Sequence, residues 1–199
     1  MAEYHFNTPI TEEEARKLKA GDTLFITGEM VTGRDAAHKR ALDLAKKGEK
    51  EKVPVNLEGK PLYFVGPLVK KENGQWKVVA AGPTTATRMD MFEPEFLKEF
   101  KTRVLIGKGA MLENTMQGCK EVGAIYASYT GGAAALAAKR IKRVKDVHWL
   151  DLGTPEAMWV FEVEEFGPLT VDIDSHGRNL HKEVNEKVKK KRNEIFDKL

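Results

Sequence analysis

The stretch Gly82-Pro83-Thr84-Thr85-Ala86-Thr87-Arg88-Met89-Asp90 follows directly on the apolar run Val78-Val79-Ala80-Ala81. The run predicts a buried strand that ends at the Gly-Pro turn, and Thr84 and Thr85 are expected to cap a helix that begins there. Such a helix start attracts anions, because its first amides are unpaired and its dipole end is positive. Arg88 adds a planar guanidinium that can hold a carboxylate at two points.

A second motif, Gly107-Lys108-Gly109-Ala110-Met111, comes after another apolar run, Val104-Leu105-Ile106. The two glycines around one lysine allow backbone amides and an ammonium group to approach a bound group closely. Both motifs therefore suit a small carboxylate or phosphate.

The composition indicates a globular chain. Its 199 residues are enough for one well-buried core and somewhat few for two independent domains, so a single domain over 1–199 is expected. The net charge of +3 is too small to indicate a nucleic-acid partner. No apolar run is long enough to cross a bilayer and the start of the chain lacks the features of a leader, so a soluble, cytoplasmic protein without membrane contact is expected.

The single cysteine, Cys119, limits the metal chemistry of the chain. It excludes an internal disulfide, and one thiolate cannot hold an iron–sulfur cluster, which needs several. His176 lies close to Asp172 and Asp174, but their spacing fits no metal site. The sequence therefore predicts no metal site in this chain, and any iron–sulfur centre must come from another chain.

The first part of the chain is expected to be rich in strands. Thr11 and Glu14 form a capping box, which predicts a short helix to about Ala20. Asn73-Gly74 is the strongest short hairpin signal in the sequence. The expected helices of this part are 11–20 and 34–47, and the expected strands are 23–27, 61–65, 68–70 and 76–79.

After Asp90, strands and helices alternate, which favours βαβ units and a partly parallel sheet. The expected helices are 95–100, 112–121 and 133–141, and the expected strands are 103–106, 124–127, 147–150, 158–163 and 169–173, with a turn at 166–168. The tail from Asn179 predicts a charged helix with a narrow apolar stripe of Val184, Val188, Ile195 and Leu199. The fold class is therefore α/β, with a β-rich first part and an alternating strand–helix second part.

GPTTATRMD followed by GKGAM resembles the β region of the iron–sulfur-dependent hydro-lyases, which comprise class I fumarate hydratases and L-tartrate dehydratases. Supporting matches occur in a fixed order along nearly the whole chain, at 33–40, 131–136, 151–153 and 156–157. The resemblance implies a compact, single swivelling β/β/α domain. Some family members carry Lys-Gly-Asn-Arg where this chain has Lys108-Gly109-Ala110-Met111, so any contribution of that arginine is lacking here.

The resemblance also implies an activity and a partner. A class I fumarate hydratase adds water reversibly to fumarate to give L-malate, at a 4Fe-4S cluster held by three cysteines of the α region. This chain would be the β subunit, inactive alone, in a hetero-oligomer with an α subunit that carries the cluster; a homodimer is left open for the chain by itself. The alternatives are the β subunit of L-tartrate dehydratase, which converts L-tartrate to oxaloacetate, and a free-standing anion-binding module.

Four residues carry over from the family motifs, namely Arg34, Thr84, Arg88 and Lys108. The resemblance implies that Arg34 and Arg88 bind the substrate carboxylate that does not sit on iron. It implies that Lys108 binds substrate and stabilises the extra charge of the aci-carboxylate. It points to Thr84 as the catalytic base, although a threonine hydroxyl needs a charged relay or nearby cations to lower its pKa. Without the family, Thr84 would be a helix cap and the three basic residues would be solvated surface groups.

Two residues near these motifs are given no role in the predicted site. His38 lies beside two basic residues on the 34–47 helix and is expected to be exposed rather than catalytic. Asp90 is expected to pair with a nearby cation.

Overall fold

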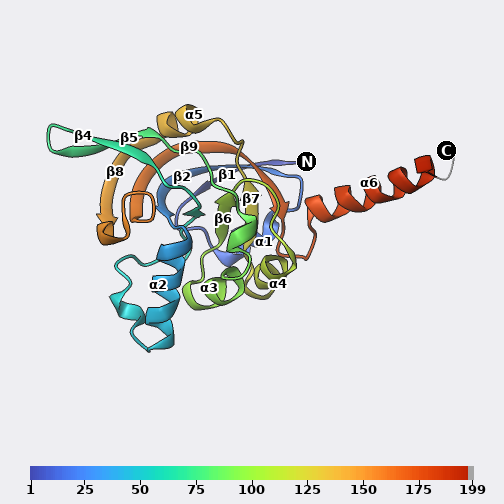
Figure 1. Cartoon of the computed structure of the whole chain (residues 1–199), viewed down its shortest axis with the longest axis horizontal. Coiled ribbons are helices and arrows are strands. Elements are labelled where there is room, and N and C mark those ends of the chain that lie inside the picture. The colour runs from blue at the N-terminus through green and yellow to red at the C-terminus, as the bar shows by residue number, and fades with distance from the viewer. Residues whose placement is uncertain (197–199) are drawn as a thin grey trace.

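The structure, a computed structural model, describes residues 1–196 and is built around a mixed seven-stranded sheet (Figure 1). Its strands are β1 (Glu3–Asn7), β2 (Thr23–Thr32), β3 (Leu62–Tyr63), β6 (Val104–Gly107), β7 (Ile125–Ser128), β8 (Ile141–His148) and β9 (Met158–Ile173). The helices are α1 (Glu12–Lys17), α2 (Asp35–Lys46), α3 (Glu93–Phe100), α4 (Glu113–Val122), α5 (Ala134–Arg140) and α6 (Leu180–Phe196). A separate hairpin consists of β4 (Leu68–Glu72) and β5 (Gln75–Ala80).

These elements confirm the α/β class. The swivelling β/β/α architecture and the single domain over 1–199 stay predictions, and 197–199, with Leu199 of the expected apolar stripe, lie outside the described residues.

The strand order is β1-β2-β3-β6-β7-β9-β8. Strands β1, β2, β3, β6 and β7 run parallel, as the alternation of strands and helices predicts, and β9 runs antiparallel to its neighbours. Because β9 also pairs with β2, the strands β2, β3, β6, β7 and β9 close into a ring. Because β2, β3 and β6 run parallel, their carboxyl ends reach the same edge of the sheet. Ligands bind at this edge in many parallel α/β sheets.

Alternate residues of the central strands enter two different cores, as the two-residue period of a strand requires. Val104 and Ile106 of β6 pack in one cluster with Trp159 of β9. Leu105 packs in the other cluster, which is completed by residues of α2, α3 and α4. Figure 1 shows these three helices together on one side of the sheet. Burial on both faces explains why 104–106 is apolar at every position.

Strand β9 and the hairpin differ from the prediction in their extent or burial. The two strands expected at 158–163 and 169–173 form one strand of 16 residues, and the turn expected at 166–168 is wrong. Its Gly167-Pro168 lies where the pairing with β2 is irregular, which tolerates a residue without an N–H group. The run 78–81 was expected to be a buried strand, but 78–80 belong to β5 of the hairpin, where Val79 is 42% exposed, and only Ala81 is fully buried.

Asp90 is buried and caps α4 instead of pairing with a cation. Its Oδ1 accepts hydrogen bonds from the backbone N–H groups of Leu112 and Thr115, at 2.9 and 3.0 Å, and from the hydroxyl of Thr115 at 2.7 Å. The expected cation pair is wrong, because amides at the start of a helix lack partners inside the helix and satisfy this carboxylate.

Replacing Asp90 by alanine is expected to lower the free energy of unfolding by about 1–3 kcal/mol, because three donors lose their acceptor in a buried place. Asp90→Asn keeps an oxygen of the same shape and is expected to cost less. Urea denaturation followed by circular dichroism measures both. Equal stability of Asp90→Ala and wild type would contradict the capping role.

Candidate functional site

The four predicted site residues lie on segments that leave one edge of the sheet. Arg34 follows β2 and directly precedes α2, and Lys108 directly follows β6. Thr84 and Arg88 belong to the segment between β5 and α3, which pairs with the segment of Lys108. The fold therefore brings together residues from three distant parts of the chain.

The segment of Thr84 runs between the ends of β3 and β6. On one side, the N–H of Lys108 donates to the carbonyl of Thr84 at 3.2 Å and the N–H of Ala86 donates to the carbonyl of Lys108 at 3.0 Å, which forms a parallel bridge between Thr85 and Lys108. On the other side, the N–H and the hydroxyl of Thr84 both donate to the carbonyl of Phe64, each at 2.8 Å. The two motifs found in the sequence are thus neighbours in space.

Thr84 is therefore not a helix cap. The bridge to Lys108 keeps the backbone extended, and the next helix is a 3-10 turn, Thr87–Met89, whose N-cap residue makes no side-chain capping bond. The predicted helix start with its anion-attracting amides is wrong. The positive charge at this turn comes from side chains instead.

Arg88 is held by Asp35, the first residue of α2. Its Nε lies 2.9 Å from both carboxylate oxygens of Asp35, and its Nη1 donates to the carbonyl of Thr85 at 3.2 Å. A guanidinium has five N–H donors, so these bonds fix its orientation and leave donors for a ligand. The side chain is 39% exposed, so Arg88 is both oriented and accessible.

Arg34 is held by Glu156. Its Nε lies 3.1 Å from one carboxylate oxygen of Glu156, without the alignment of a hydrogen bond. The other oxygen accepts from the N–H of Ala36 at 2.9 Å, in the first turn of α2. A carboxylate at a helix start is favourable, so Glu156 both stabilises α2 and positions Arg34.

Gly66 packs against the guanidinium of Arg34. A Cβ at this position would lie 2.7 Å from Nη1 of Arg34 and 2.8 Å from Cβ of Pro155, closer than atoms can pack. Gly66 follows Phe64 by two residues, so this contact links Arg34 to the segment that carries Thr84.

Gly66→Ala is expected to displace Arg34. In the hydro-lyase that the resemblance implies, this is expected to reduce kcat/KM by roughly a hundredfold, since a shift of about 1 Å in a positioning group has effects of this size. The added methyl group is expected to lower stability by about 1–3 kcal/mol. Steady-state kinetics and thermal unfolding of the same preparation separate the two effects. Unchanged kcat/KM would show that the position of Arg34 is unimportant.

Lys108 differs from the two arginines because no salt bridge joins it to another residue within 1–196. Its stem runs beside Gly131, where an added Cβ would lie 3.5 Å from Cδ of Lys108. The hydroxyl of Tyr126 donates to the carbonyl of Gly109 at 2.8 Å and so fixes the loop that contains Lys108. An ammonium group without an internal carboxylate, on a fixed loop, is available to a bound anion.

These contacts form a closed circuit. In order, it runs through Arg34, Asp35, Arg88, Thr85, Lys108, Thr84, Phe64 and Gly66 and returns to Arg34. It contains three basic residues, Arg34, Arg88 and Lys108, and one carboxylate, that of Asp35; the carboxylate of Glu156 pairs with Arg34 beside it. These residues, from Arg34 to Gly66 in the order given, are called the cationic patch below. They carry a surplus of positive charge that suits a small dianion.

The cationic patch is open to solvent. Thr85, Thr87 and Arg88 are exposed. Two large apolar side chains in the same loops, Met91 and Leu112, are 74% and 49% exposed. Exposed apolar groups beside a charged site are typical of a surface that another protein covers. This openness favours a site completed by a partner over an enclosed pocket of a free-standing module.

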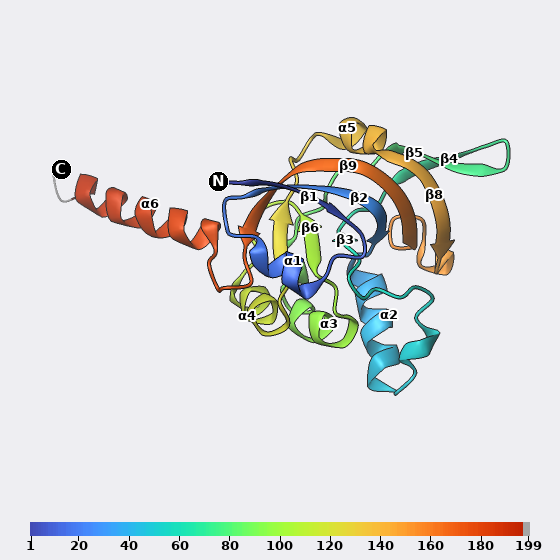
Figure 2. The ribbon, with the colours of Figure 1, turned by 180° about the vertical axis from the view of Figure 1, so that it is seen from behind.

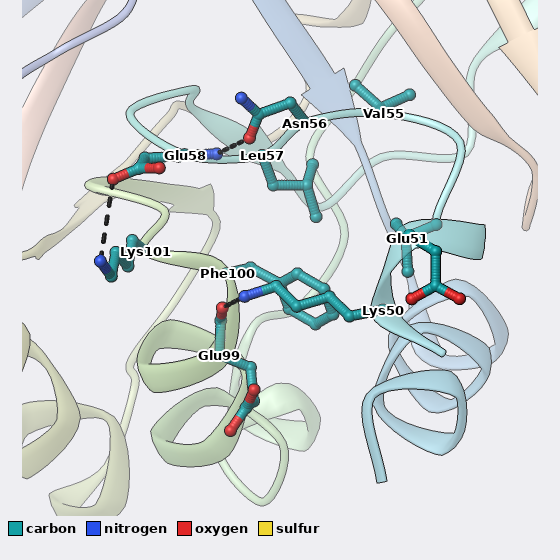
Figure 3. A pocket seen from close by; sticks show the side chains of 10 residues that line it. Lys50, Glu51, Val55, Asn56, Leu57, Glu58, Glu99, Phe100 and Lys101 are labelled. Carbon is teal, nitrogen blue, oxygen red and sulfur yellow. Dashed lines mark hydrogen bonds and ion pairs between the residues drawn. The ribbon is translucent and has the colours of Figure 1, made fainter. Parts of the chain in front are cut away.

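A hollow of about 320 Å³ lies apart from the cationic patch, beside the end of α3 (Figure 3). The ammonium group of Lys50 contacts the carbonyl of Glu99 and lies 5.3 Å from the ring centre of Phe100, and Lys101 pairs with Glu58 at 3.9 Å. These charged groups already have partners, and the predicted site residues do not line the hollow.

Comparison with known proteins identifies the family. The family model described as the fumarase C-terminus matches residues 1–184. This chain belongs to the fumarase C-terminus family. The resemblance recognised in GPTTATRMD and GKGAM is thereby confirmed.

Relatives of this fumarase C-terminus chain include separate subunits and a longer protein. It is 38% identical over 192 residues to the L(+)-tartrate dehydratase subunit beta of Escherichia coli strain K12, which covers 96% of this chain and 93% of the relative. It is 42% identical over 195 residues to a putative L(+)-tartrate dehydratase subunit beta of Methanocaldococcus jannaschii, with 98% of each chain covered. It is 44% identical over 177 residues to a putative fumarate hydratase class I of Geobacillus stearothermophilus, covering 88% of this chain and 33% of the relative.

A buried pair in this fumarase C-terminus chain supports Arg34 and was missed by sequence reasoning. His38 is 1% exposed, and its Nδ1 lies 2.9 Å from the carbonyl of Arg34. Because a carbonyl only accepts, Nδ1 carries a proton. Its Nε2 lies 3.0 Å from a carboxylate oxygen of Glu93, and both side chains are fully buried. Burial raises the pKa of Glu93, and the neighbouring ring of His38 opposes this rise.

The expected exposure of His38 is wrong because of how α2 packs. The buried residues of this helix are Ala37, His38, Ala41 and Leu42. Their spacing of one and four residues places His38 on the core face, and this spacing is the signal that could have identified it.

The residues of this chain do not fit an iron–sulfur cluster. Cys119 is fully buried in α4, and burial raises the pKa of its thiol. Over 1–196 there is no group of three His, Cys, Asp or Glu side chains arranged to hold a metal ion. His176 lies in a turn, where its N–H donates to Asp174 and its Nε2 to the carbonyl of Arg16.

Among the described helices, none has the length and apolar character of a membrane span.

Proposed function

We propose that this chain is the β subunit of a two-subunit class I fumarate hydratase and supplies binding and proton-transfer groups for the reversible hydration of fumarate to L-malate. The cationic patch, which includes Arg34, Thr84, Arg88 and Lys108, supports this proposal. The relatives named subunit beta support a separate partner chain. The relative named putative fumarate hydratase class I supports the reaction.

The two arginines bind and orient the dicarboxylate. Arg88 keeps N–H donors free after its bonds to Asp35 and Thr85, and these can hold a carboxylate in the plane of the guanidinium. Arg34 is the second cation at this end, positioned by Glu156. Bidentate pairing fixes the direction of the double bond before any proton moves, which supplies part of the rate enhancement.

Lys108 acts at the charged intermediate. When a proton leaves the carbon next to a carboxylate, that carboxylate gains a second negative charge as an aci-carboxylate. An ammonium group without an internal counter-ion stabilises this form more than the ground state, and only such a difference raises kcat.

Thr84 is the proposed proton-transfer residue on the strength of the family motif. Its hydroxyl donates to the carbonyl of Phe64 and keeps its lone pairs available to accept a hydrogen bond. The cations of the patch, Arg88 and Lys108, are the groups that would lower the pKa of this hydroxyl. The base role therefore requires substrate and partner to be in place.

Thr84→Val is expected to lower kcat by roughly a hundredfold, because it removes the hydroxyl and keeps the shape. Thr84→Ser keeps the hydroxyl and is expected to retain most of the activity. Both are measured in the assembled enzyme. Equal loss in the two variants would assign Thr84 a packing role only.

The 4Fe-4S cluster belongs, in this proposal, to the α subunit. The one thiol of this chain is buried in α4, so no catalytic step is assigned to a cluster on this chain.

The β subunit of L-tartrate dehydratase is the second candidate, because relatives matched over nearly their whole length carry that name. Anaerobic assays of this chain, mixed with a cluster-reconstituted α subunit, would compare kcat/KM for fumarate, L-malate and L-tartrate. Higher values for fumarate and L-malate support the proposal. Turnover of L-tartrate alone would replace it with the second candidate.

A free-standing anion-binding module is distinguished by calorimetric titration of this chain alone with fumarate. Micromolar binding by the chain alone, with no turnover in the mixture, would favour the module. Weak binding that is accompanied by turnover in the mixture is the result we expect, because the cationic patch is open on one side.

A further inference from the structure

Helix α6 leaves the body of the molecule and runs into solvent (Figures 1 and 2). Every residue over 184–196 is exposed. Val184, Val188, Ile195 and Phe196 are large apolar residues among them, between 52% and 64% exposed. A single helix of 17 residues is only marginally stable in water. A projecting helix with exposed apolar side chains is therefore expected to pack on another surface.

The apolar side chains lie mainly on one narrow face. Val184, Val188 and Ile195 are spaced by four and seven residues, which brings them to the same side of a helix. All four residues over 189–192 are lysine or arginine. Lys191 lies between Val188 and Ile195 on the apolar face, and the other three lie on its flanks. A narrow apolar face between charged flanks is the pattern of a helix that inserts into a groove.

The root of α6 is attached to the loop that follows Lys108. The side-chain amide of Asn179, which precedes α6, donates to the carbonyl of Met111 at 3.1 Å. Lys182 pairs with Glu113, the first residue of α4, at 3.3 Å. α6 is therefore fixed at its start beside the loop that leaves the cationic patch, and its residues over 184–196 are exposed.

The comparisons place most of α6 outside the domain that the family shares. The family model ends at residue 184. The alignment with the subunit beta of M. jannaschii spans 195 residues, or 98% of this chain, and so continues well into α6. α6 thus lies beyond the common domain but within the part shared with a relative that is a separate subunit.

We propose that α6 is the docking helix for the partner subunit. Its face of Val184, Val188 and Ile195 inserts into an apolar groove on the partner, and carboxylates at the rim of that groove pair with the basic residues over 189–192. The inference rests on the proposed function, because the occupant is the subunit that completes the site. A second copy of this chain suits the face less well, since two copies would bring their basic flanks together.

The test compares two double variants of the full chain. Val184→Glu with Val188→Glu places two charges on the apolar face, and Asn185→Glu with Asn193→Glu places the same two charges on other faces of α6. The probe is the partner subunit from the same source, purified without its cluster so that binding is independent of activity. The first variant is expected to bind roughly a hundredfold more weakly than wild type, and the second within about threefold of it.

Each outcome separates this inference from the proposed function. Both variants are expected to keep the thermal midpoint of wild type, because the substituted residues are exposed. If wild type binds the partner and the face variant binds equally well, the docking role of α6 is overturned and the subunit proposal stands. If wild type does not bind the partner, the subunit proposal itself fails. If wild type is a dimer in sedimentation equilibrium and only the face variant is a monomer, the occupant is a second copy and the inference is overturned.

Discussion

Replacing Lys108 by alanine is expected to lower kcat of the assembled enzyme by roughly a hundred- to a thousandfold. Lys108 is the basic residue of the cationic patch that forms no salt bridge within 1–196, so its charge is fully available to the intermediate. KM is expected to change much less than kcat, since in the proposed site the arginines provide most of the ground-state binding. Steady-state kinetics on fumarate and L-malate, with the α subunit in excess, measure both.

Two further variants make this result specific. Lys98→Ala removes an exposed lysine on α3 and is expected to keep the activity of wild type. Arg88→Ala is expected to raise KM and lower kcat together, because in the proposed site it removes a group that binds and orients the substrate. Unchanged circular dichroism would show that the fold persists. Retained kcat in Lys108→Ala would remove Lys108 from the site.

Replacing His38 by alanine is expected to lower the free energy of unfolding by about 3–5 kcal/mol, because it leaves the buried carboxyl of Glu93 without its partner. It also removes the ring that contacts the carbonyl of Arg34 at 2.9 Å, so activity is expected to fall as well. Urea denaturation of this chain alone measures the stability. A loss below about 1 kcal/mol would contradict the role of the pair.

The loss of stability in His38→Ala is expected to depend on pH in a defined direction. Burial raises the pKa of Glu93 above 4.5, so the unfolded chain releases this proton at lower pH than the folded chain does. The corresponding stability is complete below about pH 4.5 and is lost as pH rises through the folded pKa. The neighbouring ring of His38 opposes the rise, so His38→Ala is expected to raise the pKa of Glu93 further and to lose more stability at about pH 8 than at about pH 5. Glu93→Gln is the control, because it keeps the size and has no proton to lose.

Local patterns in the sequence were sufficient for many elements. The capping box of Thr11 and Glu14 is present with both of its hydrogen bonds. Asn73 and Gly74 both adopt positive φ at the hairpin turn, as an Asn-Gly turn requires. The strand predicted at 103–106 is β6 with a shift of one residue. These features depend on residues that are close in sequence, and the pattern therefore contains them.

The elements that differ depend on contacts between distant residues. β9 is one strand because β2 pairs along most of its length, across more than a hundred residues of sequence. Thr84 is extended because Lys108 and Phe64 hold it from two sides, and a local pattern of Gly-Pro-Thr cannot contain those partners. His38 is buried because α3 supplies Glu93.

The candidate site was predictable only through its motifs. The residue types of Arg34, Arg88 and Lys108 indicated an anion, and the resemblance assigned their roles. The carboxylates that hold the two arginines, Asp35 and Glu156, carried no recognisable signal, since charged residues on a surface are common. Their pairing is set by the tertiary fold.

One measurement tests the central claim most directly, namely that this chain completes a hydro-lyase site held partly by another subunit. A fixed amount of cluster-reconstituted α subunit would be titrated anaerobically with this chain while the hydration of fumarate is followed. The account predicts no turnover by either subunit alone and a rate that rises to a plateau as the chain saturates its partner, with no such rise for Lys108→Ala. A mixture that binds tightly yet turns over none of fumarate, L-malate and L-tartrate, or an α subunit that is equally active alone, would contradict it.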